Sequence, residues 1–152
     1  MFNRSDVRRA CIPGAGGIGN ARSLALVFAV LAGRGQVGGF RLLSEARVES
    51  FTVPRPVRYE YDEVIGQIPV LGQGGFWLGG SSPPSEPVIG PSPRVLAHNG
   101  AGGSIAWADL DGGFAAAITH NRMFAQNPPL PADRHPFVPI GDAIRESISL
   151  GL

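Results

Sequence analysis

The fold is decided by residues 97–123, which read AHNGAGGSIAWADLDGGFAAAITHNRM. Two short runs in this stretch, Ser104 to Ala108 and Phe114 to Thr119, have the length and composition of strands. The residues between them include Asp111-Gly112, and an Asp-Gly pair in this position is a strong hairpin signal. Another candidate strand, Arg94 to His98, comes just before. We therefore expect an antiparallel meander at the centre of the fold.

Working outward from the meander, the sequence predicts three helices. Asn20 is a plausible N-cap for a helix from Ala21 to Ala32, which ends at Gly33 and is nearly all apolar after Ser23, so we expect it to be buried on most sides. Ser44 is expected to cap a short helix through Phe51. A closing helix over about 140–150, capped near Asp142, is predicted by the apolar stripe Ile140, Ile144 and Ile148.

The other segments carry weaker patterns. Phe76-Trp77-Leu78 predicts one more strand. Proline-rich composition predicts irregular chain at 54–74 and an extended strap at 125–141, and the Ser/Pro/Gly-rich residues 79–93 predict a surface loop. The expected fold class is therefore α/β in the broad sense (α+β), with antiparallel strands flanked by helices and the strand-rich part at about 74–120.

Composition excludes several function classes. The 152 residues suit about one domain, and the net charge is +1. All 13 basic residues are arginines and form no run, so no nucleic acid is expected as a partner. A single cysteine, Cys11, rules out an internal disulfide, and the three histidines lack metal-ligand spacing, so no metal site is expected.

No membrane segment is expected either. The apolar run Leu24 to Ala32 is too short to span a bilayer. A secretory signal is not favoured, because Asp6 and a glycine-rich loop stand where its basic region should be. The expected location is therefore cytoplasmic.

Residues 14–19, Gly-Ala-Gly-Gly-Ile-Gly, match the Gly-x-Gly-x-x-Gly pattern of a dinucleotide-binding turn. The segment that should be the preceding strand is only a few residues long and ends at Pro13. The first acidic residue after the helix, Glu45, comes about six residues late for a ribose contact. We therefore expect no cofactor, and keep a dinucleotide-binding protein as an alternative.

His98-Asn99-Gly100 ends a candidate strand and is followed by the small residues Ala101 and Gly102. A strand end without bulk can let a substrate lie close to the backbone, where amide N–H groups can face a carbonyl oxygen. The motif alone is much more typical of a strand that ends in a glycine turn.

The order of the surrounding motifs favours a functional role for His98-Asn99-Gly100. These are PGAGGIGNARSLA, RLLSE, GGFWL and HNGAGGS, with Asn-Arg-Met downstream. In this order they resemble the C-terminal part of the β-lactamase-related serine hydrolases, that is, the class C β-lactamase-like esterases (family VIII carboxylesterases). The resemblance implies that residues 1–152 form a single partial domain of the β-lactamase/transpeptidase-like fold.

Members of that family use a Ser-x-x-Lys nucleophile, a Tyr-x-Asn or related motif, and a facing Lys-Thr-Gly or His-x-Gly strand. The resemblance gives His98 the third-motif position and the Ala101 N–H an oxyanion position. It makes Asn99, Gly100 and Gly102 candidate substrate contacts. The substrate of the complete parent would be a small ester or a β-lactam-like compound.

The other two family motifs are missing. The sequence contains no lysine, so it holds no Ser-x-x-Lys nucleophile, and neither Tyr59-Glu60-Tyr61 nor Tyr61-Asp62-Glu63 is Tyr-x-Asn. Because acyl transfer needs a nucleophile with its base, we expect this chain to be inactive alone. The alternative is a non-catalytic partner that docks on a complementary chain. An uncovered sheet edge would favour self-association.

Overall fold

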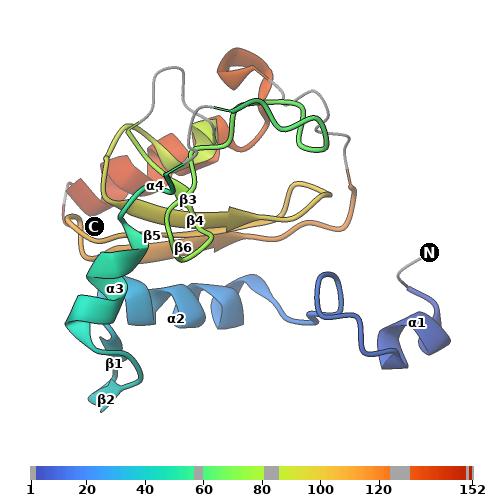
Figure 1. Ribbon diagram of the computed structural model, residues 1–152, viewed down its shortest axis with the longest axis horizontal. Coiled ribbons are helices and arrows are strands. Elements are labelled where there is room, and N and C mark those ends of the chain that lie inside the picture. The colour runs from blue at the N-terminus through green and yellow to red at the C-terminus, as the bar shows by residue number, and fades with distance from the viewer. Residues whose placement is uncertain (1–2, 57–59, 81–85, 124–130, 150, 152) are drawn as a thin grey trace.

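The computed structural model describes residues 3–56, 60–80, 86–123, 131–149 and 151. A four-stranded antiparallel sheet of order β3-β4-β5-β6 forms its middle layer, and α2 and α4 lie on opposite faces of it (Figure 1). The mixture of helices and antiparallel strands confirms the predicted α+β class. The sheet is built from β3 (Trp77–Leu78), β4 (Val95–Asn99), β5 (Ile105–Asp109) and β6 (Phe114–Ile118). The helices and the small hairpin are α1 (Ser5–Arg9), α2 (Ala21–Ala32), β1 (Gln36–Val37), β2 (Phe40–Arg41), α3 (Glu45–Phe51) and α4 (Val138–Ser149), with 3-10 turns η1 (Pro87–Ile89) and η2 (Ala132–Arg134).

The predicted meander is present with nearly the predicted ends. Asp109 is the last residue of β5, and its side chain accepts hydrogen bonds from the N–H groups of Asp111 and Gly112 at 3.0 and 2.8 Å. An aspartate that bonds to the backbone two and three residues ahead stabilises a turn. The chain then returns at Phe114, which pairs with Asp109. The Asp-Gly signal thus located the hairpin correctly.

Helix α2 covers one face of the sheet, but it is less buried than the sequence predicted. Its Asn20 side chain accepts a hydrogen bond from the Ser23 N–H at 2.9 Å, so the predicted N-cap is confirmed. Phe28 and Leu31 are buried in the cluster with Leu96 of β4. The expectation of burial on most sides was wrong, because nothing described packs over the outer side of the helix. Leu26 and Val27 are 56% and 64% exposed there.

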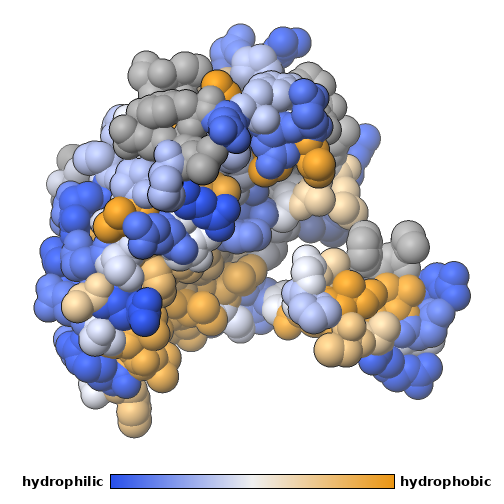
Figure 2. Space-filling model, viewed as in Figure 1, coloured by the Kyte–Doolittle hydropathy of each residue, from blue (hydrophilic) through white to orange (hydrophobic). Residues whose placement is uncertain are grey.

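These exposed residues border a wider apolar surface. An open groove of about 450 Å³ lies between α2, α3 and the chain before β3. Phe40 and Leu42 are also exposed nearby, and Figure 2 shows apolar side chains gathered on this lower part of the molecule. Large exposed apolar patches are unusual on soluble monomers and typically mark interaction surfaces.

Helix α4 covers the opposite face and begins earlier than predicted. It starts at Val138, so the expected cap near Asp142 was wrong, and so was an extended strap over residues 138–141. Residues 125–130 of the predicted strap lie outside the described chain. Proline is tolerated in the first turn of a helix, where its missing N–H costs no hydrogen bond, and Pro139 is placed there. The predicted isoleucine stripe is only partly confirmed: Ile144 packs on the core, whereas Ile140 and Ile148 are exposed.

The N-terminal residues 3–20 are nearly all exposed and extend away from the sheet (Figure 1). They contain the short helix α1, which is not among the three helices that the sequence predicted. Among the described residues, no helix is long and apolar enough to cross a membrane.

An ion-pair network ties α3 to the meander. The Glu49 carboxylate lies 2.9 Å from the Arg34 guanidinium and 2.8 Å from that of Arg94, which also contacts Asp111 at 2.8 Å. Hydrogen bonding to Arg94 lowers the pKa of Glu49. A carboxyl group with a lowered pKa in the folded state stabilises the fold above its unfolded pKa, and the effect is lost as the pH falls through the folded pKa.

We expect Glu49→Gln to lower the free energy of unfolding by about 1 kcal/mol at pH 7, a small value because the pair is partly solvent-exposed. The loss should shrink toward zero as the pH falls below the ordinary glutamate pKa of about 4.3 and on through the lowered pKa of Glu49, where the carboxyl group of the parent chain becomes protonated. Urea denaturation at several pH values measures it. The control is Glu63→Gln at an exposed carboxylate without an ion pair in the described chain. A constant difference between the two variants across that range would contradict the assignment.

Candidate functional site

His98 lies near the end of β4 and is exposed. Side chains alternate between the two faces of a strand. Leu96 belongs to the cluster under α2, whereas Val95 and Ala97 belong to the cluster on the α4 side. His98 therefore points to the α2 side of the sheet. Its neighbours across the next two strands are Ala106 and Ala117, so the imidazole is flanked there by small side chains.

A tight turn follows His98 and Asn99. The Gly100 N–H donates to the Ser104 carbonyl at 2.7 Å, and the Gly103 N–H donates to the Gly100 carbonyl at 2.9 Å. Gly103 has φ of +101°, in the region that side chains with a Cβ rarely adopt, so glycine is required here. The turn holds Ala101 at its exposed tip. Its N–H donates to no group in the described part of the chain, as an oxyanion donor requires.

Gly102 lies next to Ala101 and is half-buried. A Cβ at this position would lie 2.7 Å from the Met123 side chain, so methionine covers this side of the turn. Gly100 is different, because its nearest neighbour to an added Cβ is the Ser104 carbonyl oxygen at 3.6 Å. Of these two candidate contacts, Gly100 is the more accessible to a substrate.

Asn99 points away from His98. Its Nδ2 donates to Glu86 Oε2 at 2.8 Å on the α4 side of the sheet. Glu86 Oε1 accepts from the Val88 N–H at 3.2 Å, which caps η1. The structure therefore brings His98, Gly100 and Ala101 to one strand end, and places the Asn99 side chain in a partly buried contact on the opposite face of the sheet.

The sequence did not indicate the buried contact of Glu86, because it predicted a surface loop over 79–93. The residue is only 4% exposed, and this burial raises the pKa of its carboxyl group. A signal was present: Glu86-Pro87 places a capping acceptor directly before a proline, the pattern of a helical start. Burial of the capping residue itself was not predictable from that pattern.

His98 is not paired with a nucleophile in the described part of the chain. In the described chain, its imidazole has no hydrogen bond to a hydroxyl or thiol group. His135 is buried, and its Nδ1 accepts from the Phe137 N–H at 3.2 Å. Burial lowers the pKa of His135. The described residues contain no cluster of three or more His, Cys, Asp or Glu side chains that could hold a metal ion.

The glycine loop at 14–19 does not have the setting of a dinucleotide-binding turn. In such a turn a strand precedes the loop, but here α1 precedes it, and no strand occurs among described residues before β1. A Cβ at Gly14, Gly17 or Gly19 would meet nothing within 4 Å. These glycines are thus not required by close packing around the loop.

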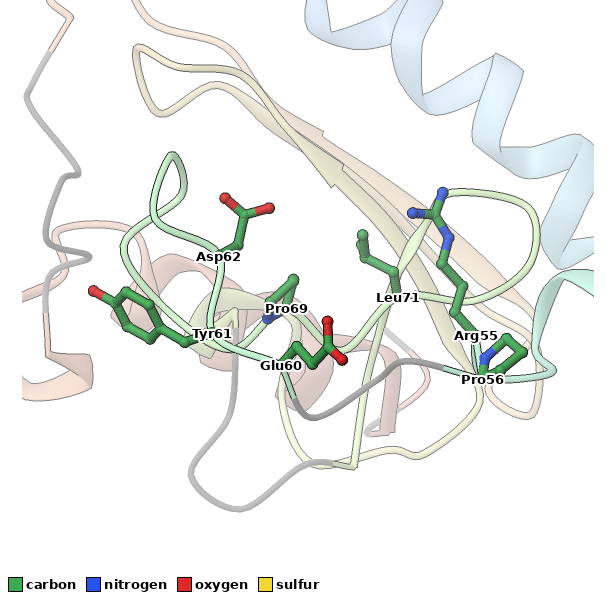
Figure 3. A pocket seen from close by; sticks show the side chains of 7 residues that line it. All are labelled: Arg55, Pro56, Glu60, Tyr61, Asp62, Pro69 and Leu71. Carbon is green, nitrogen blue, oxygen red and sulfur yellow. The ribbon is translucent and has the colours of Figure 1, made fainter.

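A separate open cavity of about 480 Å³ lies on the irregular chain before β3. In Figure 3, Arg55 and Asp62 lie on opposite sides of Leu71, and the Tyr61 ring points away from them. None of its lining residues belongs to β4 or to the 100–103 turn. They are Arg55, Pro56, Glu60, Tyr61, Asp62, Pro69 and Leu71. This cavity is therefore not part of the His98 site.

The chain is similar in sequence to a known esterase. No family model matches the chain. Over 136 residues, 90% of the chain, it is 34% identical to the esterase/β-lactamase LipL of Mycobacterium tuberculosis. The chain is related to the β-lactamase-related esterases. It spans 29% of the length of LipL, so the similarity to this esterase concerns one part of a longer protein.

Solved structures of β-lactamase-related proteins share the fold. A family VIII carboxylesterase superposes with a TM-score of 0.65 at 28% identity, over 82% of this chain and 31% of that one. A penicillin-binding protein homologue from Caulobacter crescentus gives a TM-score of 0.59 at 29% identity, over 68% of this chain and 26% of that one. These values confirm the resemblance and the β-lactamase/transpeptidase-like fold.

Proposed function

We propose that this chain supplies one wall of the acyl-transfer site of a serine esterase, and that the nucleophile comes from outside it. The observation that carries this proposal is the exposed strand end with His98 and the unpaired Ala101 N–H, in a chain related to esterases. His98 would support the proton transfers around a nucleophilic serine, and the Ala101 N–H would stabilise the oxyanion of the tetrahedral intermediate. The substrate class is a small ester or a β-lactam-like compound.

The chain alone is expected to be inactive, because an oxyanion donor without a nucleophile and its base provides little catalysis. The purified chain should hydrolyse no p-nitrophenyl acetate above background and take up no fluorophosphonate probe. A chimera in which it replaces the matching part of LipL should do both. Serine labelling of the chain alone would refute the proposal, and so would a folded chimera without activity.

The second candidate is a non-catalytic chain that docks on a complementary polypeptide. The exposed apolar surface around Leu26, Val27 and the groove beside α2 favours it, since such a surface fits a partner. A LipL polypeptide that lacks the matching part, mixed with this chain, tests it. Stable co-elution without ester hydrolysis would support the docking function over the catalytic one.

A further inference from the structure

Glu86 holds two segments of the chain together with one carboxylate. Its Oε1 accepts from the Val88 N–H and its Oε2 from Asn99 Nδ2. Asn99 is the last residue of β4, and the 100–103 turn begins directly after it. The carboxylate therefore joins the start of η1 to the base of the turn that presents Ala101.

The η1 side of this link is itself held by α4. Arg145 Nη1 donates to the Val88 carbonyl at 2.8 Å, and its guanidinium packs against Gly90. Val88 and Ile89 are almost fully buried in the cluster beneath α4. A continuous series of contacts thus runs from α4 through Val88 and Glu86 to Asn99. The 100–103 turn is therefore held in place from the face of the sheet opposite His98.

Stability alone does not explain a carboxyl group at this place. Removing a charge from water is costly, and burial raises the pKa of Glu86 despite both hydrogen bonds. The two carboxylate oxygens provide two hydrogen-bond acceptors at a fixed separation. One accepts from η1 and the other from Asn99 of β4. A single amide oxygen could not accept from both donors in that geometry.

We propose that Glu86 is a positioning residue, which fixes Asn99 and thereby the turn that carries the Ala101 N–H. This inference rests on the proposed function of the turn. Glu86 itself lies behind the strand and contacts no reacting group. Its effect on the turn can be measured without any catalytic activity.

The test is amide hydrogen exchange on the full chain with Glu86→Gln. Glutamine keeps one acceptor oxygen, so either the Asn99 or the Val88 donor loses its partner. We expect the hydrogen-bonded amides of Gly100 and Gly103 to exchange roughly tenfold faster, as the loss of about one buried hydrogen bond implies. The amides at the centre of the sheet should be unchanged. Glu146→Gln, at an exposed position on α4, is the matched control.

A reciprocal variant provides the rescue. In Glu86→Gln combined with Asn99→Asp, the new amide can donate to the new carboxylate while its oxygen still accepts from Val88. Turn exchange should return to the rate of the parent chain. If Glu86→Gln does not fold, Asn99→Ala cuts the same link from the other side and should give the same local increase.

Three results would overturn the proposal: turn amides that exchange at the parent rate in both single variants, a uniform increase over the whole sheet, or a double variant as fast as Glu86→Gln. All three results are measured by amide hydrogen exchange on the isolated chain. Failure of the chimera to hydrolyse esters would instead count against the proposed function and leave the exchange result standing.

Discussion

Replacing His98 by alanine in the LipL chimera is expected to lower kcat/KM for p-nitrophenyl acetate by about 100-fold to 1,000-fold, the range typical of a lost proton-transfer group. The imidazole is exposed at the end of β4 and makes no hydrogen bond within the described residues, so its removal breaks no contact of the fold. Urea denaturation of the isolated chain should therefore be unchanged. Steady-state kinetics of the chimera measure the loss.

His98→Lys is the informative companion variant. The family's third motif carries either lysine or histidine at this position, so we expect the lysine variant to retain activity within about tenfold. Arg47→Ala, at an exposed position on α3 whose side chain makes no hydrogen bond or ion pair in the described part of the chain, controls for a general effect of substitution on the chimera. An alanine variant at position 98 as active as the parent chimera would remove His98 from the catalytic proposal.

The meander was predictable because its signals are local. Asp109 and the Asp-Gly pair specify the turn through bonds between residues two and three positions apart. Asn20 and Ser44 cap their helices in the same local way. The strand end at His98 followed from the meander, and the comparisons then confirmed the resemblance that the motif order indicates.

The errors arose where contacts between distant segments decide the structure. Helix α2 is apolar throughout after Ser23, yet burial depends on what lies beside it, and Leu26 and Val27 are uncovered. Glu86 is charged and lies in a loop-like sequence, but Asn99, a residue 13 positions later, satisfies its carboxylate in the interior. No period or composition within either segment encodes such a partner.

Gly141→Ala is expected to lower the free energy of unfolding by about 2 kcal/mol, as overpacking of a close contact does. The sign is unusual, because alanine in a helix interior is normally preferred over glycine by about 1 kcal/mol. Here a Cβ on Gly141 would clash with the Val88 carbonyl oxygen, a backbone atom that cannot rotate away. This close approach also explains why the isoleucine stripe is only partly buried, since α4 lies against η1 through a residue without a side chain.

Urea denaturation of the isolated chain measures this loss, with Gly17→Ala as the control, since a Cβ there would meet nothing within 4 Å. A Gly141→Ala chain as stable as the parent would show that α4 can move off η1 without cost. If the helix is instead held as the structure shows, the clash displaces Val88, whose N–H donates to Glu86. Gly141→Ala should then also speed amide exchange at Gly100 and Gly103, more than global destabilisation alone predicts, whereas Gly17→Ala should leave it unchanged. The same substitution therefore tests the packing of α4 and its connection to the turn beside His98.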